Sequence, residues 1–166
     1  MKQQHARLIQ AMVEYDGGDV PRIQHFMKVH DFAVTIAQLE GVDEETVFVL
    51  ETAAILHDIG IHVSEQKYGN CNGKHQEEEG PAEARRVLAQ VGGYTPGQTE
   101  RVCFLIAHHH TYKNVEGIDW QILLEADFLV NAYEDHLDKK GIRTFEEKVF
   151  KTRTGRHLLE TMVGDL

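Results

Sequence analysis

The sequence predicts an all-α protein, because apolar residues recur at intervals of three and four while the alternation typical of strands is nearly absent. The chain has 166 residues, of which 42% are hydrophobic, and it contains three prolines and no internal repeat. This length suits one compact domain and is short for two. We therefore expect residues 1–166 to form a single domain.

Two helices are expected in the first forty residues. Apolar residues on one side of the segment 2–15 predict the first helix, and a pair of glycines ends it. Asp19 and Pro21 then provide an N-cap and a first-turn proline, which are typical of a helix start. The second helix is expected over 20–40.

The third helix is expected to be the central one. Asp43 caps it, and its interior VFVLETAAIL is apolar on almost every side, which is typical of a helix enclosed by others. Residues 63–74 are dense in glycine and asparagine, so they predict a long loop of functional length. Further helices are expected at 75–92, 96–112, 118–138 and 143–163.

The charge of the chain excludes some functions. Its formal net charge is -10, which argues against binding to nucleic acid or to an anionic membrane. No run is expected to reach the roughly 20 apolar residues that span a bilayer, and the N-terminus lacks the apolar core of a signal peptide. Cys71 and Cys103 are therefore expected to be reduced thiols, and the protein to be cytoplasmic.

Eleven histidines are more than a chain of this length usually carries. His5, His136 and His157 lie among polar residues and are expected on the surface. His57 and Asp58, in contrast, follow the apolar run AAIL at the end of the central helix. Burying an unpaired carboxylate there would be costly, so we expect an ion pair or a metal ion. An imidazole beside a carboxylate suits a divalent transition metal.

Two further residues extend this pair. His25 lies at the apolar boundary of the second helix, and alone it would be interpreted as a core histidine. Asp127 follows a hydrophobic run in ILLEADFLVN, again on a helix. With His57 and Asp58, these residues form an ordered set on three helices that a bundle could bring to one point. His30, five residues after His25, is expected to point elsewhere.

The segments that carry these residues resemble the HD-domain superfamily of metal-dependent phosphohydrolases. RIQHFMKV is similar to its first-histidine segment, AAILHDIG to its HD segment and EADFLVN to its final segment. The resemblance covers 20–132 and implies an HD-domain-like helical bundle, with the N- and C-terminal helices packed on this core. It also implies that His25, His57, Asp58 and Asp127 hold a divalent metal, and that the protein hydrolyses a small phosphoester, such as a nucleotide or a related metabolite.

Binuclear members of the superfamily add a histidine from each of two further segments, so the resemblance implies one or two metal ions. GKHQEEEGPAEARRVL supplies His75, for which His62 could compete, and RVCFLIAHHHTY supplies His109, with His110 as the next choice. For the three adjacent histidines of this segment, His108, His109 and His110, a surface cluster or a hydrogen-bond network is the alternative. A regular helix cannot aim three neighbours at one ion, because it turns about 100° per residue.

The resemblance also implies catalytic roles. Asp58 would bridge two ions, and a protonated histidine of the cluster, His109 or His110, would donate a proton to the leaving oxygen. Three lysines are candidates for binding substrate phosphate, although solvated loop lysines are the alternative: Lys67, Lys74 and Lys113.

The sequence also departs from some branches of the superfamily. It has Ile59-Gly60-Ile61 where hydrolases of guanosine tetraphosphate carry an acidic pair, and it lacks the GYP tripeptide of cyclic-dinucleotide phosphodiesterases. Two alternative functions stay open: an HD-fold di-iron oxygenase and a non-catalytic, metal-supported nucleotide sensor. The expected partner is a small phosphorylated substrate, and apolar faces on the first and last helices could support a homodimer.

Overall fold

A computed structural model describes residues 1–164, and within this range the chain forms nine helices and no strand. The expected all-α fold is confirmed. The helices are α1 (Gln3–Tyr15), α2 (Val20–Leu39), α3 (Glu44–Leu56), α4 (Ile61–Tyr68), α5 (Gly73–Val91), α6 (Pro96–Ile106), α7 (Ile118–Glu134), α8 (Lys139–Val149) and α9 (Arg153–Val163).

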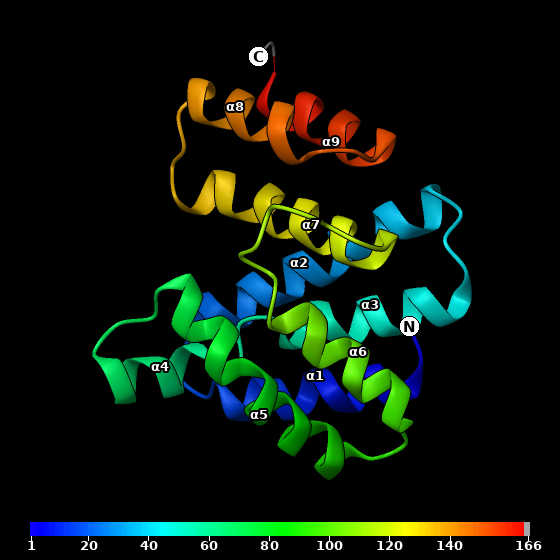
Figure 1. The fold of residues 1–166 in the computed structure, drawn as a ribbon, viewed down its shortest axis with the longest axis vertical. Coiled ribbons are helices and arrows are strands. Elements are labelled where there is room, and N and C mark those ends of the chain that lie inside the picture. Colours follow the sequence, from blue (N-terminus) through cyan, green and yellow to red (C-terminus); the bar gives the residue numbers. More distant parts are fainter. Residues whose placement is uncertain (165–166) are drawn as a thin grey trace.

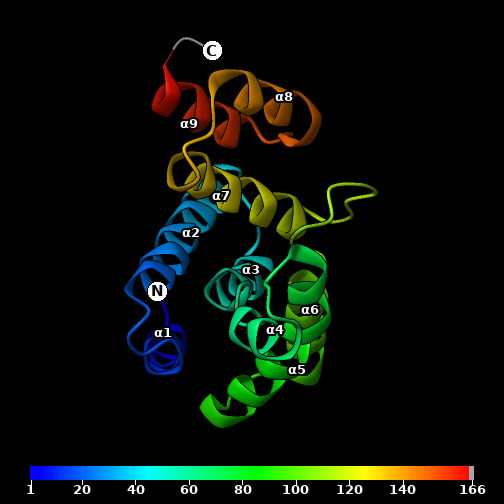
Figure 2. The same cartoon turned by 90° about the vertical axis from the view of Figure 1, so that its left-hand side faces the viewer.

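Helix α3 is the centre of the bundle. Every residue from Val47 to Leu56 is buried, and the helix packs against α1, α2, α6 and α7. The sequence predicts this position, because a helix that is apolar on all sides is most stable when other helices surround it and shield its side chains from water. Figures 1 and 2 show α3 between α2 and α6.

The remaining helices pack on two sides of this centre. Helix α7 lies along α2 and also contacts α3, while α5 pairs with α6 and with α4. Helices α8 and α9 lie together on the far side of α7, at the top of both views (Figures 1 and 2). The segments that carry the candidate ligands therefore approach one another along the interior side of α7.

The prediction of a long loop at 63–74 is largely wrong. Half of the segment belongs to α4, its last two residues begin α5, and the irregular part is confined to 69–72. Gly69 ends α4 with a left-handed φ of 71°, and Asn72 caps α5 by accepting the backbone N–H of His75 at 3.0 Å. The turn-forming residues thus mark a short corner between two helices.

The prediction of a single helix at 143–163 is also wrong, because α8 and α9 share this segment. The chain breaks between α8 and α9, where the buried carboxylate of Glu125 accepts the backbone N–H groups of Lys151 and Thr152, at 2.7 and 3.0 Å. Thr152 also caps α9 by accepting the N–H of Gly155. A partner on α7, which no local pattern reveals, therefore supplies the hydrogen bonds that make the break.

One stretch, Glu44–Tyr68, is long and apolar enough to cross a membrane on length and composition alone, which the sequence analysis did not expect. Its mean hydropathy reaches 1.4 over an 18-residue window, and 78% of that window is buried inside the bundle. The stretch contains α3, so its apolar side chains already contact other helices. Burial of this kind is typical of a core helix.

Candidate metal centre

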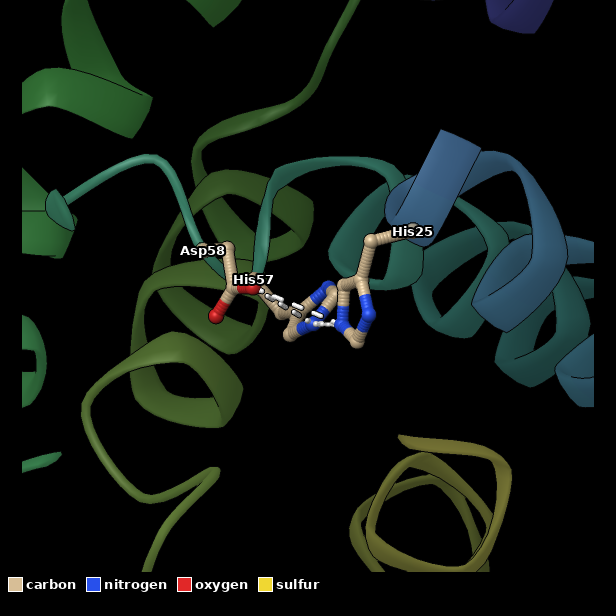
Figure 3. A group of neighbouring side chains, drawn as sticks. All are labelled: His25, His57 and Asp58. Carbon is tan, nitrogen blue, oxygen red and sulfur yellow. Dashed lines mark hydrogen bonds and ion pairs between the residues drawn. The ribbon is translucent and has the colours of Figure 1, made fainter. Parts of the chain in front are cut away.

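The end of α3 directs two polar side chains into the bundle. The helix stops at Leu56, and residues 57–60 form a turn. In Figure 3, His57 and Asp58 leave this turn and meet His25, which reaches them from α2. The change from helix to turn allows neighbouring residues to face one centre, which a continuous helix would not.

Four residues meet at this centre, which we call the HD cluster: His25, His57, Asp58 and Asp127. The Nε2 atom of His25 lies 3.2 Å from Nε2 of His57, 3.1 Å from Oδ1 of Asp127 and 3.4 Å from Oδ2 of Asp58. His57 Nε2 lies 3.4 Å from the same oxygen of Asp127. Asp58 is the most exposed member, with 24% of its side chain accessible, so the cluster opens to solvent at this carboxylate.

The opposite ring nitrogens define how these imidazoles are oriented. His57 Nδ1 lies 2.8 Å from the carbonyl oxygen of Ala54, and His25 Nδ1 lies 2.7 Å from a carboxylate oxygen of Glu134. Carbonyl and carboxylate oxygens only accept hydrogen bonds, so both Nδ1 atoms carry protons. Two neutral rings would then point their Nε2 lone pairs at each other and at carboxylate oxygens. Such an arrangement requires a cation at its centre, either a proton or a metal ion.

Without a metal, protons supply that positive charge. Burial alone would lower the pKa of His25, but the hydrogen bond to Asp127 and the charges of Asp58 and Asp127 raise it to about 9. Burial alone would raise the pKa of the Asp127 carboxyl, but hydrogen bonds from His25 and His57 hold it well below its usual range. Two nitrogen and two carboxylate donors of this kind fit a divalent transition ion, which would displace the protons on binding.

A second group of possible ligands shares Asp58 with the HD cluster. Helix α6 ends at Ile106, earlier than expected, and residues 107–110 form a turn. His109 Nε2 lies 3.4 Å from Oδ1 of Asp58, and the ligand atoms of Asp58, His109 and His110 all lie within 4.8 Å of one another. The two Asp58 oxygens thus face different imidazole groups, which is the arrangement of a bridging carboxylate.

His110 differs electrostatically from the imidazoles of the HD cluster. Burial lowers its pKa to about 4, and the neighbouring His109 acts in the same direction. His110 is therefore uncharged at neutral pH. A neutral imidazole suits a metal ligand or a hydrogen-bonding group better than the protonated donor that the sequence suggested.

The structure does not bring His75 to either group. Its ring stacks on Tyr68 with centroids 3.8 Å apart, and its Nδ1 lies 3.0 Å from the side-chain oxygen of Asn70. The next residue, Gln76, is buried instead, and its Oε1 lies 3.3 Å from His109 Nε2 and 3.1 Å from His110 Nε2. Gln76 was not among the predicted ligands, because an amide is a less usual ligand than an imidazole.

The sequence profile of the HD domain family matches residues 22–152, which is most of the chain. This chain belongs to the HD domain family. A crystal structure of a predicted HD superfamily hydrolase from an uncultured Thermotogales bacterium is similar, with 26% sequence identity and a TM-score of 0.62. The match covers 93% of this chain and 82% of that one. A search of curated proteins found no significant match.

Other histidines of this HD domain have structural partners. His108 does not belong to the metal centre. Its Nδ1 lies 2.7 Å from the carbonyl oxygen of Phe104, and its ring stacks on Phe104 and packs edge-on against Trp120. His62 lies 3.0 Å from a carboxylate oxygen of Asp16 and 3.1 Å from the guanidinium of Arg22.

The predicted surface position of His5 is wrong, because this residue is fully buried. Its Nδ1 lies 3.0 Å from one oxygen of Glu51, and the Nε2 of His30 lies 3.0 Å from the other oxygen. His136 and His157 are exposed as expected.

The three candidate phosphate-binding lysines lie in different surroundings. Lys67 is held by the carboxylate of Glu79 at 2.8 Å, and Lys74 lies 3.9 Å from Glu78. Both are exposed and paired with acids of α5. Lys113 is also exposed, and with Tyr112 it lines a groove whose other residues belong to α8 or directly precede it. Burial raises the pKa of Tyr112 to about 12, and the nearby carboxylates of Asp127 and Glu77 act in the same direction.

Proposed function

We propose that this HD domain is a metal-dependent phosphohydrolase that cleaves a small phosphoester, such as a nucleotide or a related phosphorylated metabolite. The observation that carries the proposal is the convergence of two buried Nε2 atoms, 3.2 Å apart, with two carboxylates. Membership of the HD domain family supports the same reaction class.

The chain holds its proposed ligands in a fixed orientation. Glu134 and the carbonyl of Ala54 each accept the Nδ1 proton of an HD-cluster imidazole, which leaves Nε2 free to bind an ion. The carbonyl of Ile106 does the same for His109 at 2.7 Å. One or two divalent ions bound here would lower the pKa of water and neutralise the phosphoryl oxygens.

Asp58 has the central role in this proposal. Its two oxygens face the HD cluster on one side and His109 on the other, and it is the member most open to solvent. Substrate phosphate would therefore approach the centre beside Asp58. The uncharged His110 would line this approach and hydrogen-bond the substrate or water.

The test is phosphate release by the purified protein, loaded separately with manganese, iron, magnesium, nickel, cobalt or zinc. A panel of nucleotides and sugar phosphates would be offered with each metal. We expect Asp58→Ala to reduce phosphate release to background and to lower the metal content, while the far-ultraviolet circular dichroism stays helical. Asp135→Ala, which removes an exposed carboxylate at the end of α7, is the matched control.

Full activity of the Asp58→Ala protein would refute the proposal. The two alternative functions predict other outcomes in the same assays. A di-iron oxygenase would consume oxygen with its substrate, and a metal-supported sensor would bind a nucleotide without releasing phosphate.

A further inference from the structure

A groove of about 730 Å³ lies between the α6–α7 connection and α8. One wall consists of Tyr112 and Lys113, which follow His110 directly in the chain. The other wall and the floor come from α8 and the residue before it. These residues are Asp138, Lys140, Gly141, Thr144, Phe145, Lys148 and Val149.

Two ring contacts join the groove to chain segments that adjoin proposed metal ligands. Phe128, next to the ligand Asp127, stacks on Phe145 with centroids 3.7 Å apart and ring planes 1° from parallel. The ring of Tyr112 packs edge-on against Phe145 at 5.1 Å. Phe145 in the groove thus contacts Phe128, the neighbour of Asp127, and Tyr112, whose raised pKa is due in part to the charge of Asp127. A substrate phosphate held at Asp58 could extend into the groove.

The groove also carries positive charge that the protein does not neutralise. Lys113, Lys140 and Lys148 form no ion pair within residues 1–164. The one acid of the lining, Asp138, caps α8 by accepting the backbone N–H of Gly141 at 2.7 Å. In a chain with 27 acidic and 17 basic residues, three unpaired lysines around an aromatic floor favour an anionic ligand with a flat apolar body.

We infer that this groove binds the leaving group of the substrate, and that the leaving group combines a flat apolar ring with a second anionic group. A nucleoside that carries a second phosphate has this chemistry. Its ring would pack on Tyr112 and Phe145, and its second phosphate would lie among the lysines. Hydrolysis would join a water oxygen to the phosphorus at the metal centre. The bond from that phosphorus to the leaving oxygen would break, and this oxygen would keep a proton from the water.

The inference rests on the proposed function and is tested with two probes that differ by one phosphate, adenosine 5′-monophosphate and adenosine 3′,5′-bisphosphate. Steady-state kinetics with the metal-loaded protein would compare Lys140→Gln/Lys148→Gln with the parent chain. We expect the KM for the bisphosphate to rise about tenfold more than the KM for the monophosphate, because the two exposed lysines would contact only its second phosphate. The effect should fall on KM and not on kcat. Lys151→Gln, an exposed lysine outside the groove, is the control.

Calorimetric titration of the bisphosphate into the same proteins separates this inference from the proposed function, because it needs no turnover. If no phosphate is released but the double variant still binds the bisphosphate about tenfold more weakly, the groove assignment stands and the proposed hydrolysis fails. If hydrolysis occurs and removal of the lysines leaves both KM and affinity unchanged, the groove assignment is overturned alone.

Discussion

At the scale of single residues, the buried histidines of this HD domain serve two purposes. Those of the HD cluster direct Nε2 toward one centre and secure Nδ1 to fixed acceptors. His5 and His30 instead bind the two oxygens of Glu51, which is 6% exposed. Each oxygen of Glu51 thus has an imidazole partner, one from α1 and one from α2, so the carboxylate joins these helices without requiring a metal ion.

Glu51 provides a prediction about pH and stability. Burial alone would raise its pKa, but hydrogen bonds from His30 and His5 lower it to about 2. Because the folded pKa lies below the unfolded value of about 4.3, ionised Glu51 stabilises the fold above that pH. This contribution is lost as the pH falls from about 4.3 toward 2. We expect Glu51→Gln to reduce the free energy of unfolding at pH 7 by about 2 kcal/mol, and by about half as much near pH 3.

Urea denaturation at a series of pH values measures both proteins. Glu147→Gln, which alters an exposed carboxylate on α8, is the control and should follow the parent chain throughout. A Glu51→Gln deficit that is the same at pH 3 as at pH 7 would contradict the assigned interaction.

The residues of the HD cluster could be predicted from the sequence because each lies beside an apolar run, which places a costly polar group near the core. His5 could not, since its neighbours in sequence are polar and Glu51, its partner, lies 46 positions away. The choice between His75 and Gln76 depends on one residue of helix register. The sequence does not determine that register, because the start of α5 is fixed by Asn72.

At the scale of helices, the centre depends on where α3 and α6 end. Both are followed by turns that carry adjacent ligands, His57 with Asp58 and His109 with His110. The apolar interior of α3 identified this helix from sequence, whereas the end of α6 was placed too late. The broken segment between α8 and α9 was missed for a similar reason, since the acceptor that stabilises the break lies on another helix.

The turn after α3 must also approach α5 closely. A Cβ atom on Gly60 would lie 2.7 Å from the backbone oxygen of Gln76 and 2.8 Å from the backbone nitrogen of Gly80. The φ of Gly60 is -74°, which any residue adopts, so the restriction is purely steric. We expect Gly60→Ala to lower the free energy of unfolding by about 2 kcal/mol or more, because backbone atoms must move.

Chemical denaturation of the purified variant measures this loss. Gly97→Ala is the matched control, because a Cβ at that position in α6 meets nothing within 4 Å. It should be neutral or slightly stabilising. Equal stability of the Gly60→Ala and parent proteins would show that the two backbones are not in this close contact.

At the scale of the whole molecule, the fold brings together segments that are far apart in sequence. His25 and Asp127 are 102 positions apart, yet their nitrogen and oxygen atoms lie 3.1 Å from each other. An ion at this point would connect α2, the end of α3 and α7. The charge of -10 is compatible with a phosphorylated substrate because the positive charge would be local, from the ion and from the groove lysines. The expected homodimer stays a prediction.

The most direct test of the central claim is anomalous diffraction from crystals of the protein loaded with manganese or zinc. We expect an anomalous peak about 2.0 to 2.3 Å from Nε2 of His25 and His57 and from oxygens of Asp58 and Asp127, and we expect it to be lost in His57→Ala crystals. Metal-loaded crystals that show no peak among these four residues, or that show a peak only at another part of the molecule, would contradict the claim.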